Sequence, residues 1–302
     1  WIRKHEPKIW EDTKYYLQVS GFFHYKLTGK ILDSTANQIG HIPFNYRTQD
    51  WCKSKWAYQY EMFDIEKEKL STIVKPSSVI GILTKEAKEQ LGFKQEIKVI
   101  AGASDKGSET LGVGCLDATK ASISFGTTAT IQTTTDTYLE PIKFMPSYPA
   151  AVAGKFNPEI QVFRGYWMIR WFKHEFASRE RIEAKKLGIA PEILLNKELN
   201  NIPPGSDGLI LQPYWKPDLK HPEAKGSIIG FSDVHTRAHI YRAIIEGINY
   251  NLYDGLLRIQ KVTKTKIDKI YVSGGGSVSD SICQITADMF GIQVVRGETY
   301  EA

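Results

Sequence analysis

The segment 269–295 constrains the fold of this chain more than any other part of the sequence. Residues 269–273 have the composition of a short strand, and the glycines 274–276 follow it directly. Residues 279–290 then show a helical pattern, and 292–295 form a second β-prone run. Strand, glycine turn, helix and strand in this order is a building unit of α/β proteins. The sequence therefore predicts an α/β fold.

The composition is that of a globular protein long enough for two domains. The 302 residues are 42% hydrophobic and 24% charged, with a net charge of +5, and a domain takes about 100–200 residues. The basic residues are scattered among acidic ones, which argues against a nucleic-acid partner. No run approaches the about 18–20 apolar residues of a membrane span, so no membrane partner is expected. Three widely spaced cysteines without zinc spacing, and no signal peptide, predict a reducing cytoplasm.

A long helix is predicted ahead of the glycine turn. Isoleucine and leucine recur every fourth residue from Ile240 to Leu256, which is the spacing of one helical face. Thr236 stands where an N-cap residue is expected.

Two more turns of small residues follow predicted strands. Residues 98–101 are a short apolar run, predicted to be a buried strand, and the turn after it enters a short helix. Residues 121–134 are two β-prone runs split by Gly126-Thr127-Thr128, which predicts a hairpin. Because ligands of α/β sheets gather at the carboxyl ends of strands, each turn is a candidate binding element.

Asp105 is the chemically interesting residue of the first turn. It follows Gly102, Ala103 and Ser104, so no bulky neighbour shields its carboxylate. Such a group can accept the proton of a hydroxyl that attacks phosphorus. The alternative is that Asp105 caps the helix that begins near Lys106, and spacing alone favours that alternative.

The other two turns could bind a nucleotide. Backbone N–H groups at Gly126 and the hydroxyls of Thr127 and Thr128 can hold phosphate oxygens, although a structural hairpin turn is the simpler explanation. Glycines 274–276 let a flat or anionic ligand approach the backbone beside a helix N-terminus. A close crossing of strand and helix explains one or two glycines, but three less readily. The sequence has no Walker P-loop and no G-x-S-x-G nucleophile elbow.

In this order the turns resemble the C-terminal portion of the FGGY family of carbohydrate kinases. The resembling segments are 101–108, 123–128 and 272–280. Residues 230–246, with His239 and Arg242, are similar to the second signature of that family. Leu27-Thr28-Gly29, followed by Asp33 and Trp51, also resembles the family's sequence before its catalytic turn.

The resemblance implies a two-domain, actin-like ATPase fold of the ribonuclease H-like α/β type, with the active site between the domains. It implies ATP-dependent phosphorylation of a sugar hydroxyl, expected on a ketopentose or related polyol, with Mg²⁺ whose ligands are unknown. A homodimer is a family expectation. By position Asp105 matches the catalytic general base at the sugar, the turn 126–128 matches the phosphate loop, and Gly275, Gly276 and Ser277 match the adenosine loop, followed by Asp280.

The sequence departs from the family pattern at one residue and at both ends. Lys106 stands where the family usually has an amide beside the sugar, so it could contact phosphate or mark an unusual substrate. The family's N-terminal segment, with a D-x-G-T phosphate loop, an aspartate linked to Mg²⁺ and much of the sugar-binding wall, is missing, and so is its last helix. We therefore expect a fold incomplete at both ends, with residues 1–116 as the C-terminal part of the first domain and 117–302 as the nucleotide-binding second domain. The chain alone is expected to be incomplete for activity.

Two other functions stay open at this point. One is an actin-like ATPase that takes no sugar. The other is a regulator that binds sugar or nucleotide and has lost catalysis. The intact Asp105 argues against the regulator, whereas Lys106 leaves room for it.

Overall fold

The computed structural model describes residues 1–40, 43–54, 57–63, 65–217 and 222–300, which form two compact units. Unit 1 comprises residues 1–108, 136–138 and 147–157. Unit 2 comprises residues 109–135, 139–146 and 158–302, and residues 301–302 lie outside the described part. The predicted domain boundary between residues 116 and 117 stays a prediction.

Unit 2 is built on a mixed five-stranded sheet in the order β11-β8-β7-β14-β15. Its strands are β7 (Lys120–Phe125), β8 (Ala129–Gln132), β11 (Glu159–Val162), β14 (Lys269–Ser273) and β15 (Gln293–Arg296). The pairs β7–β8 and β8–β11 are antiparallel, whereas β14 is parallel to both β7 and β15. The predicted hairpin and the predicted α/β unit are both confirmed. Because β7 and β14 are parallel neighbours, their carboxyl ends meet at one edge of the sheet.

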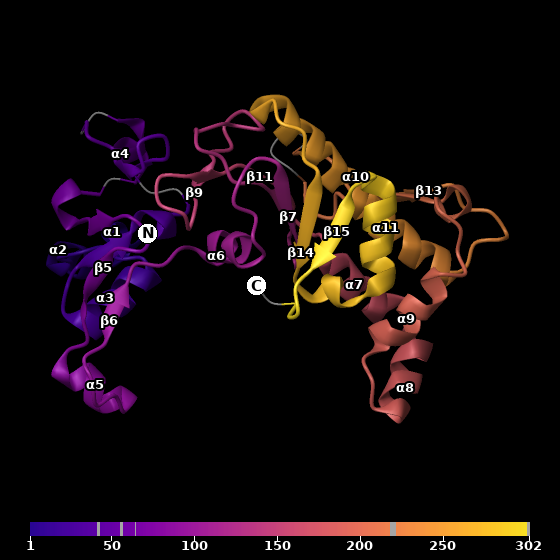
Figure 1. Cartoon of the computed structure of the whole chain (residues 1–302), viewed down its shortest axis with the longest axis horizontal. Coiled ribbons are helices and arrows are strands. Elements are labelled where there is room, and N and C mark those ends of the chain that lie inside the picture. The colour runs from indigo at the N-terminus through magenta and orange to yellow at the C-terminus, as the bar shows by residue number, and fades with distance from the viewer. Residues whose placement is uncertain (41–42, 55–56, 64, 218–221, 301–302) are drawn as a thin grey trace. The chain divides into compact units, whose positions relative to one another are not determined.

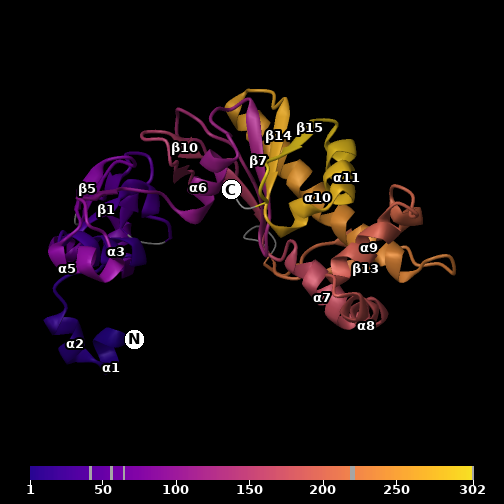
Figure 2. The same ribbon diagram turned by 60° about the horizontal axis from the view of Figure 1, so that its bottom comes forward.

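Helix α10 (Arg237–Thr263) packs on strands β8 and β11. Helix α11 (Asp280–Phe290) packs against α10, and Figure 2 shows the two helices beside each other. From Ile244 to Leu256, the residues of the predicted i+4 repeat form the buried face of α10. Gly255 lets the helix approach the sheet, because a Cβ there would lie 2.9 Å from Ile131 Cγ2. Thr236 is the N-cap as predicted, and its backbone N–H donates to His239 Nδ1 at 3.0 Å.

The remaining helices of unit 2 are α7 (Trp167–Glu175), α8 (Ser178–Leu187) and α9 (Pro191–Leu199). A small sheet pairs β12 (Ile210–Gln212) with β13 (Ser227–Ile229). Side chains from the sheet, α7, α9, α10 and α11 share one hydrophobic core. That core fixes α7 and α9 relative to the carboxyl edge of the sheet.

Unit 1 consists of short elements (Figure 1). Helix α3 (Val19–Thr28) packs against β1 (Leu32–Ser34), which pairs in parallel with β4 (Thr72–Val74). Strand β5 (Val79–Ile82) pairs with β6 (Lys98–Ile100) in a second two-stranded sheet. The other elements of unit 1 are α1 (Ile2–His5), α2 (Pro7–Asp12), η1 (Thr35–Asn37), β2 (Phe44–Asn45), β3 (Asp50–Trp51), α4 (Tyr58–Phe63), η2 (Lys67–Lys69), α5 (Lys85–Leu91), β9 (Tyr148–Pro149) and β10 (Phe156–Asn157). Helix α6 (Asp105–Gly112) contains the point at which unit 1 ends and unit 2 begins.

One sequence prediction about unit 1 is wrong in part. Residues 98–100 form the predicted strand β6, but the strand is not buried, since Lys98 is exposed and Ile100 keeps 47% of its surface exposed. The physical reason is that β6 pairs only with β5 in the described part of the chain, and no layer covers its outward side chains. An apolar run alone cannot show how many layers will cover a strand.

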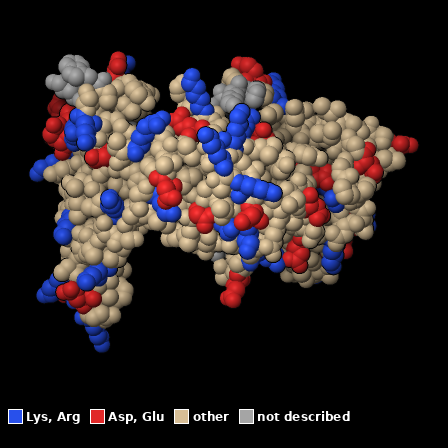
Figure 3. All heavy atoms as spheres, turned by 45° about the horizontal axis from the view of Figure 1, so that its top comes forward, with Lys and Arg blue, Asp and Glu red and all other residues tan. Residues whose placement is uncertain are grey.

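On the side shown in Figure 3, lysine and arginine side chains are interspersed with aspartate and glutamate. Among the helices in the described residues, none combines the length and the apolar character needed to cross a membrane.

Candidate active site

Two of the predicted turns meet at the carboxyl edge of the unit 2 sheet. The parallel register aligns Val272 with Ile123 and Ser273 with Ser124, so the turn after each strand begins at the same level. Gly274 has a φ of 81°, and a Cβ there would lie 3.1 Å from the Phe125 backbone. The turn 274–276 therefore lies against the last residue of β7, directly before the turn 126–128.

A cavity of about 820 Å³ opens beside these turns, entirely within unit 2. Five of the residues predicted from the sequence line it: Gly126, Thr127, Gly275, Gly276 and Asp280. The opposite walls come from α7, α9 and the first turn of α11. The fold thus brings the predicted phosphate turn and the predicted adenosine turn onto one cavity.

Glycine stands at each of the positions 274, 275 and 276 for a different physical reason. Gly274 needs its positive φ and lies against Phe125, as described above. At Gly276 a Cβ would lie 2.4 Å from Cε1 of the Tyr166 ring, a clash that the packed core cannot relieve. At Gly275 a Cβ would meet nothing within 4 Å, and this residue faces the cavity. Packing therefore explains two glycines and leaves the third open to a ligand.

Two predicted site residues have side chains that serve the turns instead of the cavity. The Thr128 hydroxyl donates to the Phe163 carbonyl at 3.2 Å. The Ser277 hydroxyl is fully buried and donates to the Gly274 carbonyl at 2.7 Å. Within the described ranges neither residue lines the cavity. Their hydroxyls hold the backbone shape of the two turns.

Sequence reasoning missed the residues that face these turns from the helices. Arg170 of α7 and Lys197 of α9 bring two cationic side chains to the cavity wall. Asn196 also lines it, with its Oδ1 accepting a hydrogen bond from the Tyr241 hydroxyl at 2.9 Å. Arg170 lies one helical turn after Tyr166, whose N–H donates to the Gly126 carbonyl at 3.0 Å, a contact between distant parts of the chain that the sequence pattern does not indicate. Nothing in the sequence pattern indicated α9.

Asp105 is the first residue of α6 and belongs to unit 1. Its side chain is exposed, and its Oδ1 accepts from the neighbouring Lys106 N–H at 2.7 Å. Ser104 fills the capping role, because its hydroxyl oxygen accepts from the Gly107 N–H at 3.2 Å. The geometry therefore removes the need for Asp105 as a cap and leaves its carboxylate facing solvent.

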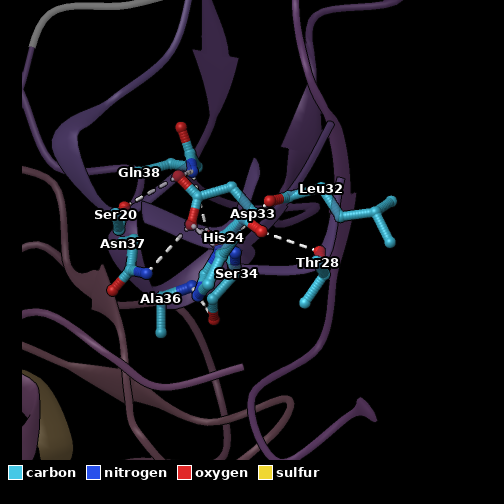
Figure 4. A network of polar contacts seen from close by, with 9 residues as sticks. All are labelled: Ser20, His24, Thr28, Leu32, Asp33, Ser34, Ala36, Asn37 and Gln38. Atoms are coloured by element: carbon cyan, nitrogen blue, oxygen red, sulfur yellow. Dashed lines mark hydrogen bonds and ion pairs between the residues drawn. The ribbon is translucent and has the colours of Figure 1, made fainter. Parts of the chain in front are cut away.

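A buried polar network around Asp33 lies in the same unit (Figure 4). Asp33 has no exposed surface, and four donors besides His24 contact its carboxylate. They are the Ser20 hydroxyl at 2.8 Å, the Ser34 N–H at 2.7 Å, the Asn37 amide at 3.0 Å and the Gln38 amide at 3.0 Å. His24 Nδ1 lies 3.4 Å from Asp33 Oδ1. The network holds the short helix η1 in place, because groups in and next to that helix donate to the Asp33 carboxylate.

This network is tied to the Asp105 turn by one backbone hydrogen bond. The Ser104 N–H donates to the carbonyl of Ala36, which lies within η1, at 3.0 Å. Asp33 therefore fixes η1 through its side-chain hydrogen bonds, and the Ala36 carbonyl of η1 fixes the backbone of Ser104. Ser104 in turn caps the helix that begins at Asp105. A buried residue more than 70 positions earlier in the chain supports the candidate base.

Charge and burial act in opposite directions on the Asp33–His24 pair. Burial, the largest influence on Asp33, pushes its pKa up, but the hydrogen bonds from His24, Asn37, Ser20 and Ser34 outweigh it, and the pKa stays below its ordinary value. The hydrogen bond to Asp33 raises the pKa of His24 above its ordinary value, against the opposing effect of burial. Both directions favour the charged pair.

The residues of the described part do not form a preformed metal site. No group of three or more histidine, cysteine, aspartate or glutamate side chains in it could hold a metal ion. Two carboxylates in the described part of the chain line the cavity, and both are paired: Asp280 with Arg296 Nη2 at 2.8 Å, and Glu192 with Lys173 Nζ. Magnesium in kinases is held largely by substrate phosphates with one or two carboxylates. The described side chains by themselves do not fit a magnesium cage, and we assign none of them to the metal.

Comparison with known proteins decides the family. The model for the N-terminal domain of the FGGY family of carbohydrate kinases matches residues 1–112, and the model for its C-terminal domain matches residues 121–302. This chain belongs to the FGGY family. The predicted family and the predicted α/β, actin-like ATPase fold are thereby confirmed.

Individual FGGY proteins match along almost the whole chain. It is 29% identical over 286 residues to the uncharacterized sugar kinase YgcE of Escherichia coli (strain K12), covering 94% of this chain and 58% of the relative. It is 29% identical to the gluconokinase of Bacillus licheniformis, covering 100% of this chain and 59% of that gluconokinase. The crystal structure of ligand-bound xylulose kinase from Lactobacillus acidophilus superposes with a TM-score of 0.80 at 25% sequence identity. The match covers 100% of this chain and 59% of the xylulose kinase chain. The chain thus spans less than two thirds of the length of these FGGY proteins.

Proposed function

We propose that this chain belongs to an enzyme that transfers the γ-phosphoryl group of ATP to a hydroxyl of a sugar, with a ketopentose or related polyol as the acceptor. One observation carries the proposal. The turns at Gly126-Thr127 and Gly275-Gly276, the two that resemble the FGGY nucleotide loops, adjoin on a single cavity of about 820 Å³.

The cavity wall suits a nucleoside triphosphate. Backbone N–H groups of a glycine turn and the Thr127 hydroxyl can donate to phosphate oxygens. Arg170, at the same wall, adds a cation that counters phosphate charge. Gly275, open to the cavity, lets the adenosine approach the backbone. Mg²⁺ bound with ATP would supply further neutralisation of the phosphate charge.

Asp105 is proposed as the general base. A bond forms between the acceptor hydroxyl oxygen and the γ-phosphorus, and the bond from the γ-phosphorus to the β–γ bridging oxygen breaks, so ADP leaves. The hydroxyl proton passes to the Asp105 carboxylate as the new bond forms. Support comes from the exposed carboxylate and from the Ser104 cap, which relieves that carboxylate of the capping role, so that within the described residues it accepts one hydrogen bond, from the Lys106 N–H.

A sugar acid is a second candidate acceptor. Lys106 directly follows the proposed base, where it would place a cation beside the acceptor. The relative named gluconokinase, at 29% identity, is consistent with an anionic substrate. Gluconate therefore belongs in any substrate test beside ketopentoses and polyols.

The decisive experiment is a coupled ADP-release screen of the full-length protein against ketopentoses, aldoses, polyols and gluconate. Release that depends on one of these acceptors supports the proposed kinase. Release without any acceptor would support an actin-like ATPase instead. Tight acceptor binding without ADP release would support a regulator. A cytoplasmic location, a homodimer and the absence of nucleic-acid and membrane partners stay predictions.

A further inference from the structure

The helix that begins at Asp105 is attached to the unit 2 sheet by a side chain of its second turn. The Ser273 hydroxyl donates a hydrogen bond to Oε1 of Glu109, and both residues belong to unit 2. Ser273 is the last residue of β14 and keeps only 1% of its surface exposed, and Glu109 is half-buried. The contact therefore joins α6 to the strand end from which the turn 274–276 departs.

The pleat of β14 explains why Ser273 faces a polar partner. Successive side chains of a strand point to opposite faces of the sheet. Val272 belongs to the hydrophobic core, so Ser273 lies on the other face. A hydroxyl buried on that face needs a hydrogen-bond partner, and the Glu109 carboxylate accepts from it. The contact thus satisfies a buried polar group of the sheet.

The end of α6 has a second attachment that does not involve the Glu109 side chain. The Cys115 N–H donates to the Thr110 carbonyl at 3.1 Å, and the Thr134 hydroxyl donates to the Cys115 carbonyl at 2.6 Å. Thr110 and Cys115 are both buried. Because these contacts stay in place when Glu109 is shortened, its loss should loosen α6 without unfolding it.

Asp105 depends on the same helix. It lies four residues before Glu109, so the two side chains are on one face of α6, one helical turn apart. A general base has to lie within hydrogen-bond reach of the proton that it takes. A displacement of about 1 Å can cost about 100-fold in rate. The orientation of α6 is therefore critical for a base at its first residue.

We propose that Glu109 is a positioning residue for Asp105, an inference that rests on the proposed function. Glu109 accepts the hydrogen bond of Ser273, holds α6 on the end of β14 and so keeps the Asp105 carboxylate in one orientation during phosphoryl transfer. Within the described ranges Glu109 does not line the nucleotide cavity. Its replacement should therefore affect turnover and leave ATP binding unchanged.

Steady-state kinetics of the full-length protein, with the acceptor that gives ADP release in the screen, test this role. Glu109→Ala is expected to lower kcat about 10–100-fold, while the KM for ATP stays within about twofold of the wild type. Glu109→Gln keeps an oxygen that accepts from Ser273, so its kcat should stay within about threefold of the wild type. Ser273→Ala should resemble Glu109→Ala, and the double variant should be no slower than the slower single variant.

Glu86 offers the matched control. It is an exposed glutamate of α5, and its Oε1 accepts from Gln90 Nε2 of the same helix at 3.3 Å. Glu86→Ala and Glu86→Gln remove the same groups without breaking a contact between elements, so both should turn over like the wild type.

Amide hydrogen exchange measures the attachment without any acceptor. Exchange in α6 should be faster in Glu109→Ala than in the wild type, whereas exchange in β7 should not change. The midpoint of thermal unfolding should fall by only about 2–4 °C, the effect of one lost hydrogen bond.

The outcomes separate this proposal from the proposed function. A wild type that releases no ADP with any acceptor overturns the proposed function, and unchanged exchange of α6 in Glu109→Ala overturns the attachment. An active wild type with near-wild-type kcat in Glu109→Ala overturns the positioning role alone. Equal losses in Glu109→Ala and Glu109→Gln would assign the effect to the charge of Glu109 and overturn it as well. If Glu109→Ala does not fold, Ser273→Ala gives the same test from the other side of the contact.

Discussion

Two aspartates of unit 1 show how surroundings decide what a carboxylate can do. Asp33 has no exposed surface and is surrounded by donors, so it cannot reach a substrate. Asp105 is exposed, and its carboxylate accepts a hydrogen bond from the backbone N–H of the neighbouring Lys106. The first is a structural anchor, and the second is available for chemistry.

Replacing Asp105 tests the proposed base. We expect Asp105→Asn to lower acceptor-dependent ADP release by about 10²–10⁴-fold, the usual contribution of a general base. ATP binding should be unchanged, because the described residues that line the proposed nucleotide cavity all belong to unit 2. Asp12→Asn, at an exposed aspartate of the same unit, is the control. Near-wild-type turnover in Asp105→Asn would exclude Asp105 as the base.

The Asp33–His24 pair predicts the pH dependence of unit 1. The Asp33 pKa is lowered from 3.8, so its contribution to the free energy of unfolding is present above that pH and is lost as the pH falls through the lowered value. The His24 pKa is raised from 6.5, so its contribution is present below that pH and is lost as the pH rises through the raised value.

Urea unfolding of the wild type and His24→Gln across the pH range measures both effects. The wild type should lose stability on the alkaline side as His24 deprotonates. His24→Gln should lose this alkaline decline and keep part of the acid one, because Asn37, Ser20 and Ser34 still donate to Asp33. The same alkaline decline in both proteins would show that His24 does not cause it.

At the scale of elements, the glycine turns could be predicted from the sequence, whereas the helices that face them could not. A glycine turn between a strand and a helix follows from local backbone preferences, which is why the segments around Gly126 and Gly275 could be placed. Arg170, Lys197 and Asn200 reach the cavity only because the core fixes α7 and α9 at the edge of the sheet. Such contacts join distant parts of the chain, and a sequence pattern does not encode them.

The adenosine turn offers a matched pair of glycine substitutions. Gly276→Ala should lower the free energy of unfolding by about 1–3 kcal/mol, because its Cβ would clash with the Tyr166 ring. Gly275→Ala meets no neighbour within 4 Å, so its stability should be close to that of the wild type, while its methyl group enters the cavity and weakens ATP binding. Thermal unfolding and ATP titration of both variants check this. Equal destabilisation of the two proteins would contradict the assigned packing.

At the scale of the whole molecule, the two units should respond differently to nucleotide. A ligand stabilises what it binds, by about 2.7 kcal/mol at a hundredfold excess over its dissociation constant. We therefore expect ATP to slow amide hydrogen exchange in β7, β14 and α11 of unit 2. Amides of α3 and β1 in unit 1 should change little, and equal protection in both units would contradict a nucleotide site confined to unit 2.

The placement of the nucleotide cavity has a consequence for how such proteins diverge. Every described residue that lines it belongs to unit 2, whereas Asp105, Lys106 and the Asp33 network belong to unit 1. On the proposed function, a lineage can adopt a new acceptor through changes near Lys106 and keep its phosphoryl donor untouched. The two units are then under separate selection. Among close homologues, substitutions that change the acceptor should accumulate in the gene segments that encode unit 1, without compensating changes in those that encode unit 2.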